Sequence, residues 1–321
     1  MNMPIAPLKP FLLGILSLWL YHASAVDQFD LKLCRDKAVY YFAEHDITKG
    51  DPELKFAVIY IHGFNGGARD AASSLRQKLQ QFKKDEKVLS IVPSFFTAKS
   101  CPKNKLGTAM LWDGGWRGGA AALNGSKISN FEVIDRIFAI LSDKKLYPAM
   151  KRIVLCGFSA GGQCVNRYIA VGKMPLASEI STGFAVGNPS TYLYIDNRRL
   201  IDGEFRNVED NDKVNPWFYG MDNRYAYCRD IPVSQAMKNL SSRPTLYFCG
   251  TADIGKRLLD VTPAAVMQGK NRYDRFLTFQ KYTALFPQWR KAVRFIAVPK
   301  IAHSATVFYK NHAIQKWVFG E

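Results

Sequence analysis

The chain has 321 residues, of which 48% are hydrophobic, and its formal net charge at pH 7 is +17. This length and composition suffice for one large domain with a single core and do not require a second domain. The basic residues are scattered, with no basic tail and no nucleic-acid-binding motif, which excludes nucleic acid as a partner. Two interpretations of the charge remain: an ordinary solvated surface, which we favour, or attraction to anionic surfaces.

The N-terminal segment has the pattern of a secretory signal peptide. Lys9 is its only charged residue, residues 11–20 are almost entirely apolar, and the small residues of 23–25 (ASA) form a cleavage site. We therefore expect removal of residues 1–25, a mature chain that starts at Val26, and a secreted or periplasmic protein. An uncleaved membrane anchor is the weaker alternative, because the apolar segment is short for spanning a bilayer.

The cysteines all lie beyond the predicted signal peptide, and export permits disulfides. Some fall in segments that we expect to be buried, where a thiol behaves as a small hydrophobic group, and the others fall in peripheral segments. The cysteines expected to be buried are Cys156, Cys164 and Cys249. The peripheral ones are Cys34, Cys101 and Cys228. We expect one or two disulfides with the pairing left open, and no metal site, because no spacing resembles a zinc site.

The first core elements after the signal peptide are two predicted strands, residues 38–43 (AVYYFA) and 56–61 (FAVIYI). The second is continuously apolar, which is typical of a strand buried on both faces of a sheet. It runs directly into the glycine-containing segment 62–67 (HGFNGG), and residues 88–92 predict the next strand. Between them we expect a helix with one apolar stripe, formed by Ala71, Leu75, Leu79 and Phe82.

Residues 94–127 have little periodicity and many Gly, Lys and Trp residues, so we expect a long loop over the sheet. Ser129 and Glu132 then have the spacing of a capping box, which marks the start of a helix. The apolar side chains that we expect on the inner face of this helix are Phe131, Ile134, Phe138 and Leu141.

The next segment, Ile153–Cys156, is a β-branched and apolar run of strand length that breaks into Gly157-Phe158-Ser159-Ala160-Gly161. This is the G-x-S-x-G pattern of a nucleophile elbow, a sharp turn from a strand to a helix. Gly157 and Gly161 carry no Cβ where the turn brings them together. We expect a helix over 163–171. The elbow is expected to expose the Ser159 hydroxyl and to direct the Ala160 N–H at an oxyanion. The alternative interpretation of the motif is a serine in an ordinary glycine-rich turn.

Residues 182–186 and 245–248 predict two further strands, and between them residues 187–242 are alternately polar and aromatic without a clear period. The segment is too long for a plain loop in a compact domain. Two interpretations have equal weight: a cap or lid inserted into the domain, or an irregular excursion whose aromatic side chains cover the core.

A serine nucleophile needs a base, and the histidine positions favour His303. It follows the last predicted strand, 293–298, and precedes a final helix, so it lies at the carboxyl end of a strand, where parallel sheets build their sites. His62 is the main competitor, because it ends the strand 56–61. We favour His303 on chain order, and expect the loop after His62 to supply a backbone N–H as a second oxyanion donor.

The acid that orients the histidine is predicted to be Asp253, which follows the strand 245–248 closely. The order Ser159, Asp253, His303 is that of α/β-hydrolases. Asp260 is the alternative acid, but its position before Thr262-Pro263 is explained by a role as a helix N-cap. We expect a helix over 272–286 after it.

The alternation of strands and helices predicts an α/β fold with a mostly parallel sheet. The chain resembles the α/β-hydrolase superfamily over about 38–320, through motifs at 61–67 (IHGFNGG), 156–162 (CGFSAGG), 248–253 (FCGTAD) and 298–304 (VPKIAHS). More narrowly, it resembles a group of secreted microbial α/β-hydrolases of undefined substrate. The narrower likeness rests on the stretches at 133–141, 187–199 and 267–276.

The resemblance implies one α/β-hydrolase domain over 26–321, with a triad of Ser159, Asp253 and His303. It also implies oxyanion donors at the backbone of Ala160 and Phe64, and no cofactor. The expected reaction is hydrolysis of a small-molecule, lipid or polymer ester through an acyl-enzyme. The alternatives are a serine peptidase or amidase on the same fold, or a non-catalytic binding protein that retains it.

Overall fold

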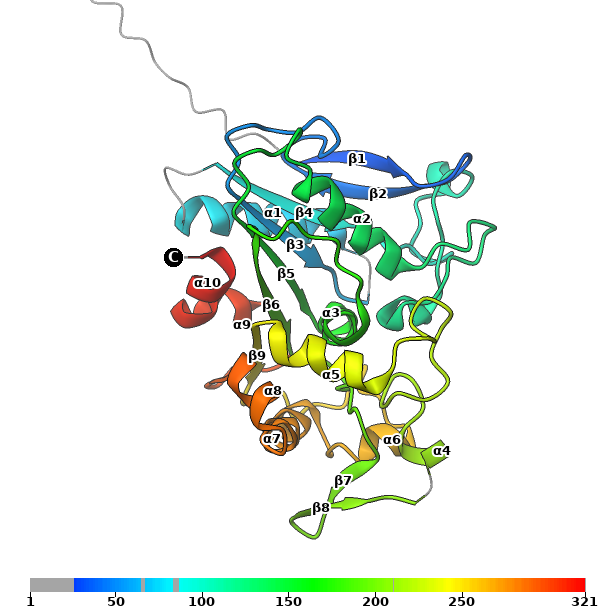
Figure 1. Cartoon of the computed structure of the whole chain (residues 1–321), viewed down its shortest axis with the longest axis vertical. Helices are drawn as coiled ribbons and strands as arrows, with labels where there is room; N and C mark the ends of the chain where they lie inside the picture. The colour runs from blue at the N-terminus through cyan, green and yellow to red at the C-terminus, as the bar shows by residue number, and fades with distance from the viewer. Residues whose placement is uncertain (1–25, 65–66, 83–86, 210, 321) are drawn as a thin grey trace, which may run out of the picture.

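The computed structural model describes residues 26–64, 67–82, 87–209 and 211–320, so the predicted signal peptide lies outside the described residues. Within them, the main sheet has eight strands in the order β1-β2-β4-β3-β5-β6-β9-β10 (Figure 1). The strands are β1 (Asp27–Lys32), β2 (Ala38–Ala43), β3 (Phe56–Ile61), β4 (Val88–Pro93), β5 (Arg152–Phe158), β6 (Ser181–Gly187), β9 (Thr245–Gly250) and β10 (Val293–Val298).

The strands from β4 to β10 in this order are parallel, whereas β1 and β2 form an antiparallel edge. β3 and β9 are buried at every position, which explains their continuous apolar sequences. The sequence predicted each of these strands except β1, an edge strand that is mostly exposed or half-buried. The predicted α/β fold with a mostly parallel sheet is confirmed.

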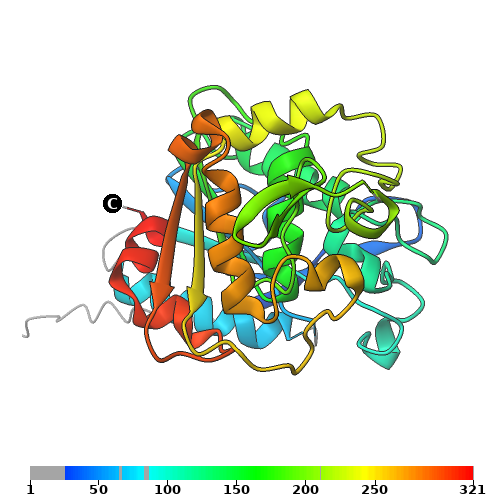
Figure 2. The ribbon, with the colours of Figure 1, turned by 90° about the horizontal axis from the view of Figure 1, so that it is seen from below.

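Helices cover both faces of the sheet. One face carries α1 (Ala68–Phe82), α9 (Thr306–Lys310) and α10 (His312–Phe319). The other carries α2 (Asn130–Ser142), α3 (Ala160–Val171), α5 (Val233–Ser242), α7 (Arg272–Thr283) and α8 (Pro287–Ala292). Seen from below in Figure 2, the red α10 and the orange α7 lie on opposite sides of β9 and β10. Each face therefore has its own apolar layer.

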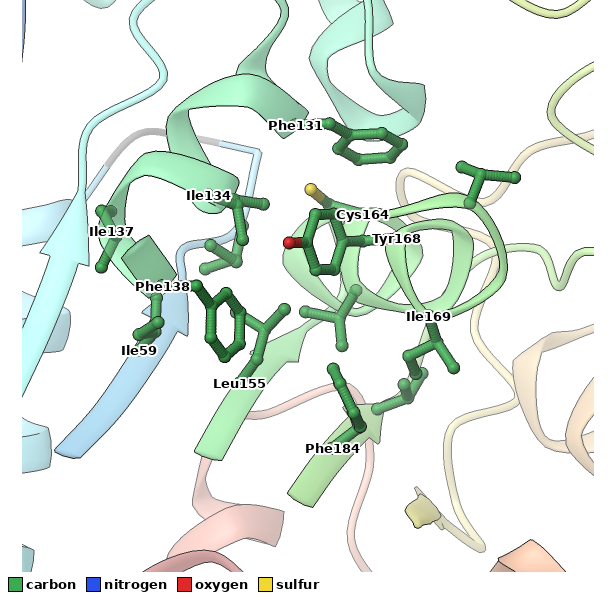
Figure 3. Packing of buried hydrophobic residues seen from close by; sticks show 14 of the residues in the cluster. Ile59, Phe131, Ile134, Ile137, Phe138, Leu155, Cys164, Tyr168, Ile169 and Phe184 are labelled. Atoms are coloured by element: carbon green, nitrogen blue, oxygen red, sulfur yellow. The ribbon is translucent and has the colours of Figure 1, made fainter. Parts of the chain in front are cut away.

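The larger layer is centred where α2 and α3 pack on β5 and β6 (Figure 3). Phe138 of α2 stacks on Tyr168 of α3 with ring centroids 6.2 Å apart, and Phe131 meets the same tyrosine edge-on at 5.4 Å. Ser129 and Glu132 form the predicted capping box at the start of α2. Burial of each such large apolar side chain contributes about 1.5–3 kcal/mol, so this layer holds the elbow strand firmly.

Two irregular segments lie at the ends of the strands. Residues 94–127 contain the short 3₁₀ helices η1 (Lys103–Lys105) and η2 (Gly114–Gly118), in agreement with the predicted loop. Residues 188–232 contain a small hairpin, β7 (Arg198–Ile201) with β8 (Glu204–Asn207), and the short helix α4 (Asn211–Val214). The last ten residues of the predicted insertion are α5, which packs on α3 and α8 as a crossover helix of the core. The insertion is therefore shorter than the sequence indicated.

The aromatic side chains of this insertion are part of the core. Tyr192 stacks on Phe279 of α7 with ring centroids 4.3 Å apart, and Tyr194 lies against Tyr282 at 4.2 Å. Trp217 is 8% exposed, and its indole N–H donates to the carbonyl of Gly118 over 2.8 Å. Of the two interpretations of residues 187–242, the structure favours the excursion whose aromatic side chains cover the core.

Buried guanidinium groups hold the irregular segments in place. Arg167 donates to the carbonyl of Phe218 and the hydroxyl of Thr191, each over 2.9 Å. Arg243 acts instead at a helix end, where it donates to the carbonyls of Ile169 and Gly172 at the C-terminus of α3, over 2.8 and 2.9 Å. Burial lowers the pKa of Arg167 to about 9. Backbone carbonyls outside helices and strands need donors when they are buried, and a guanidinium supplies several.

The predicted disulfides are absent. The cysteines all lie in the described residues, and each is a free thiol. Cys156, Cys164 and Cys249 are buried in β5, α3 and β9, as expected for small hydrophobic groups. Cys34 and Cys228 instead face local carbonyls, those of Lys37 and Tyr225, each at 3.6 Å. Separately, none of the described helices is both long enough and apolar enough to span a membrane.

Candidate active site

The serine elbow lies between β5 and α3. Ser159 has a positive φ of 58°, a conformation that is costly for a residue with a side chain. A Cβ on Gly161 would collide with the carbonyl oxygen of Ile61, and one on Gly157 would collide with the backbone of Gly161. Both glycines are therefore required by the close approach of the chain, as predicted. The helix begins at Ala160, three residues earlier than the sequence indicated.

The structure brings the three predicted side chains together at the carboxyl edge of the sheet. His303 Nε2 lies 2.9 Å from Ser159 Oγ, and His303 Nδ1 lies 2.7 Å from Asp253 Oδ2. A carboxylate has no proton to donate, so Nδ1–H donates to Asp253 and Nε2 is free to accept from the serine hydroxyl. The Asp253 side chain is fully buried and that of His303 is 27% exposed.

Adjacent strands explain why residues so far apart in sequence meet. β9 and β10 are parallel neighbours, so the loops that carry Asp253 and His303 leave the sheet side by side. Hydrogen bonds join the two loops: Ala252 N–H donates to the carbonyl of Ile301 over 3.0 Å. Lys300 N–H donates to the hydroxyl of Thr251, also over 3.0 Å.

Asp253 has two further partners that the sequence reasoning missed. Asn188 Nδ2 donates to Asp253 Oδ2 over 2.6 Å, and Arg272 Nη1 lies 3.6 Å from Asp253 Oδ1. Asn188 directly follows β6 and has a positive φ of 43°, which asparagine tolerates better than most residues. Its position after a strand could have marked it. Arg272 lies on α7, and no local pattern distinguishes it from other arginines.

Arg272 also holds the loop that follows Asp253. Its Nη2 donates to the carbonyls of Arg257 and Leu258 over 3.0 and 2.8 Å. The side chain is 1% exposed, and burial lowers its pKa while the charge of Asp253 acts in the opposite direction. One buried cation therefore joins the carboxylate of Asp253 to the backbone of residues 257–258.

His62, the competing histidine, is occupied elsewhere. Its Nε2 accepts from the N–H of Phe95 over 3.0 Å, and its Nδ1 lies 2.6 Å from the carbonyl of Gly63. Both ring nitrogens are thus used by the backbone, and neither contacts Ser159. The ring is buried beside Trp116, and burial lowers its pKa.

Asp260, the competing acid, contacts neither histidine. Its Oδ2 accepts from the hydroxyl of Tyr219 over 2.8 Å, and its Oδ1 accepts from the N–H of Thr262 over 3.0 Å. The predicted N-cap role is wrong in detail, because the N-cap of the short helix α6 (Pro263–Val266) is Thr262. Asp260 instead closes the turn that leads into that helix.

The two predicted oxyanion donors lie in the loop after β3 and at the start of α3. Neither the Phe64 N–H nor the Ala160 N–H has a hydrogen-bond partner within the part of the chain that the structure describes. Ala160 is the first residue of a twelve-residue helix, whose N-terminus favours negative charge. Residues 65–66 of the glycine-containing segment lie outside the described residues.

A pocket of about 670 Å³ opens at Ser159. Its lining residues come from the loops after β3, β5, β9 and β10 and from the start of α7: Gly63, Phe64, Phe158, Ser159, Ala252, Asp253, Ile254, Gly255, Arg257, Leu258, Arg272, Ala302 and His303. The aromatic insertion does not contribute to this lining. In the described ranges, no group of His, Cys, Asp and Glu side chains is arranged to hold a metal ion.

No family model and no curated protein matches the sequence. Among solved structures, poly(aspartic acid) hydrolase-1 from Sphingomonas sp. KT-1 is similar, with 19% identity and a TM-score of 0.62 over 92% of this chain and 98% of that one. A poly(3-hydroxybutyrate) depolymerase from Bordetella parapertussis has 17% identity and a TM-score of 0.61 over 92% of this chain and 89% of that one. The chain thus has the fold of the α/β-hydrolase superfamily that its motifs resemble.

Proposed function

We propose that this protein is a serine hydrolase that cleaves carboxylic esters through an acyl-enzyme. The observation that carries the proposal is the continuous hydrogen-bonded chain from Ser159 through His303 to Asp253 at the mouth of an open pocket. The two similar structures are, by name, a hydrolase of poly(aspartic acid) and a depolymerase of poly(3-hydroxybutyrate), which also supports hydrolysis of an ester or related bond.

The first half of the proposed reaction forms the acyl-enzyme. His303 Nε2 accepts the Ser159 proton while Oγ attacks the ester carbonyl, and the carbonyl oxygen becomes an oxyanion. Asp253 holds the imidazole in the tautomer that leaves Nε2 free and stabilises the imidazolium. The tetrahedral intermediate collapses, the C–O bond to the alcohol breaks, and His303 donates its proton to the departing oxygen.

The second half returns the free enzyme. A water molecule gives a proton to His303 and attacks the acyl carbonyl, and Ser159 leaves with that proton. In both halves the N–H groups of Ala160 and Phe64 are the proposed donors to the oxyanion. Such preorganised donors usually make the largest single contribution to catalysis in this type of reaction.

Asn188 and Arg272 give Asp253 a fixed orientation in this scheme. Asn188 holds the same carboxylate oxygen that accepts from His303, and Arg272 lies against the other. Both are buried, so they contact the carboxylate from inside the protein. A rigidly held carboxylate is what the imidazole needs to keep its orientation through both steps.

The test is labelling with a fluorophosphonate together with hydrolysis of 4-nitrophenyl hexanoate. We expect the wild type to react with both and Ser159→Ala to react with neither. Ser178→Ala, which changes an exposed serine on the surface, is the matched control and should equal the wild type. A wild type that takes the label but cleaves an amide of the same acyl group faster than the ester would indicate a peptidase or amidase instead.

We also propose that the enzyme acts outside the cytoplasm, on the basis of its signal-peptide pattern. Mass spectrometry of the protein produced in its native host should find Val26, or a residue a few positions away, at the N-terminus. Intact Met1 in a membrane fraction would contradict this.

A further inference from the structure

The pocket beside Ser159 has an exposed apolar rim. Ile254 is 62% exposed, Leu258 is 61% exposed, and Phe64, on another loop, is 48% exposed. All three line the pocket. Large apolar side chains that gather at such a mouth typically contact an apolar part of a ligand, whereas single exposed ones elsewhere need no explanation.

The loop that carries this rim is held in a costly conformation. Leu258 has a positive φ of 53°, which is unfavourable for a bulky residue. Arg272 holds it there through the carbonyls of Arg257 and Leu258. The same buried cation that contacts Asp253 therefore fixes Leu258 relative to the serine and the histidine.

The rim also carries Arg257, for which the described residues supply no ion-pair partner. Of the lining residues that the structure describes, Asp253 and Arg272 face each other in a buried pair. Arg257 is exposed, and no acidic side chain in the described residues forms an ion pair with it. A second cation lies close by: Arg117 is 5.9 Å from the centre of the Phe64 ring. Among the described lining residues, Asp253 is the only acidic one.

On the basis of the proposed function, we propose that the substrate is an ester that carries a carboxylate on an apolar segment. The apolar segment contacts Phe64, Ile254 and Leu258, and the carboxylate pairs with the Arg257 guanidinium. A guanidinium presents paired N–H donors that match the two oxygens of a carboxylate, so Arg257 is suited to this recognition. The carboxylate belongs to either the acyl or the alcohol part of the ester, and the experiment separates the two.

The experiment compares pairs of esters that differ only in the carboxylate. For the acyl part, the pair is the mono-4-nitrophenyl ester of adipic acid and 4-nitrophenyl hexanoate. For the alcohol part, the pair is 4-carboxyphenyl hexanoate and phenyl hexanoate. Each kcat/KM is measured for wild type and for Arg257→Gln, and the ratio of the two proteins cancels the intrinsic reactivity of each ester.

We expect Arg257→Gln to lower kcat/KM about fivefold for one of the carboxylate esters, the upper range for an exposed ion pair, and to leave both neutral esters unchanged. Higher salt should lower wild-type activity on that ester alone, because exposed charges are screened. The substitution should not disturb the fold, since Arg272 contacts the backbone of residue 257 and not its side chain.

Lys256→Gln is the matched control: it removes the same charge from the neighbouring exposed residue, which does not line the pocket. An equal effect of Lys256→Gln would overturn the proposal, because general attraction by a basic protein would then explain the preference. Hydrolysis of the neutral esters without any dependence of either carboxylate ester on Arg257 would also overturn it, while leaving the proposed function intact. If no ester is hydrolysed and Ser159 takes no fluorophosphonate label, the proposed function fails and this inference with it.

Discussion

The parallel sheet and the irregular segments around it satisfy their buried backbone groups in different ways. In β3, β5 and β9 the N–H and carbonyl groups pair with neighbouring strands, and the side chains are almost all apolar. In residues 188–232 and 251–271, outside the small β7–β8 hairpin, the backbone follows no ladder, and buried arginines donate to its carbonyls. A carbonyl left without a donor costs about 1–3 kcal/mol, so these arginines replace the ladder.

The difference bears directly on the candidate site. The sheet places Ser159 and the loops of Asp253 and His303 at one edge. The irregular segments supply Ile254 and Leu258 of the pocket rim, and Asn188, which donates to Asp253. Arg272 connects the two parts, because it forms an ion pair with Asp253 and donates a hydrogen bond to the carbonyl of Leu258 in the rim. Substitutions at the sheet edge should therefore affect chemistry, and those in the irregular segments mainly stability.

The largest expected effect is that of Ser159→Ala at the elbow. Removal of a triad nucleophile lowers kcat by about 10⁶. The hydroxyl packs little and the backbone turn is kept by the glycines, so the melting temperature should stay near that of the wild type. The measurement is hydrolysis of 4-nitrophenyl hexanoate beside thermal unfolding. Turnover above a few per cent of wild type would exclude this serine as the nucleophile.

Asp253→Asn should have the next largest effect. An asparagine allows the imidazole to adopt the wrong tautomer, which in trypsin lowers kcat about 10⁴-fold. The variant should still react slowly with a fluorophosphonate. Asp260→Asn is the matched control: it should retain near wild-type rates, with any loss appearing as lower stability through Tyr219 and Thr262. Exchanged phenotypes would make Asp260 the acid.

Arg272→Met tests the residue that belongs to both parts. Removal of one partner of a buried ion pair lowers the free energy of unfolding by about 3–5 kcal/mol. The substitution also removes the guanidinium that contacts both Asp253 and the backbone of residues 257–258. The kcat/KM of the folded fraction should therefore fall at least about tenfold. Both quantities are measured below the melting temperature of the variant.

Arg275→Met is the control for that prediction. Arg275 is also buried and donates to the carbonyls of Ser190 and Asp260, over 2.6 and 2.8 Å, but it makes no ion pair with Asp253. The Arg275→Met variant should have a lower free energy of unfolding and an unchanged kcat. Arg272→Lys should recover part of the activity by returning a positive charge. Equal losses of kcat for Arg275→Met and Arg272→Met would mean that Arg272 acts on the fold alone.

Trp217→Ala distinguishes the two interpretations of residues 187–242, a lid over the active site or a segment whose aromatic side chains cover the core. A buried aromatic side chain replaced by alanine costs about 3–5 kcal/mol, and the hydrogen bond to Gly118 is also lost. We expect a large fall in melting temperature and unchanged KM for short and long 4-nitrophenyl esters. Changed chain-length preference with little loss of stability would restore the lid interpretation of this segment.

The smallest expected effect concerns His62, a buried ionisable group in the sheet part. Burial lowers its pKa in the folded protein, so the unfolded chain binds its proton more readily. The contribution of His62 to the free energy of unfolding is therefore complete above the pKa of the unfolded chain, about 6.5, and is lost as the pH falls below that value. The loss is at most about 1.4 kcal/mol per pH unit. Urea unfolding between pH 7 and 5 should show this loss.

His62→Gln provides the comparison, because glutamine does not titrate and its carbonyl can accept from Phe95. The loss of stability between pH 7 and 5 should be smaller in this variant. An unchanged pH dependence would indicate that other groups cause the loss. A smaller loss in the variant would mean that the sheet part keeps its buried base neutral, whereas the irregular segments keep their buried arginines charged.

The sequence by itself determined the local features. Continuous apolar runs predicted the buried strands, Ser129 and Glu132 predicted the start of α2, and the glycines around Ser159 predicted the elbow. Each of these signals depends on residues a few positions apart, whose steric and hydrogen-bonding needs are met locally. Proximity of Asp253 and His303 to the serine could also be expected, because parallel strands end at one edge.

Only the tertiary structure decided the rest, because it depends on contacts between residues far apart in the chain. The backbone groups that occupy both ring nitrogens of His62 were not indicated by any local pattern. Arg272 has no local pattern that marks it as a partner of Asp253. The free thiols and the burial of Trp217 likewise follow from packing between distant segments, which neither composition nor periodicity encodes.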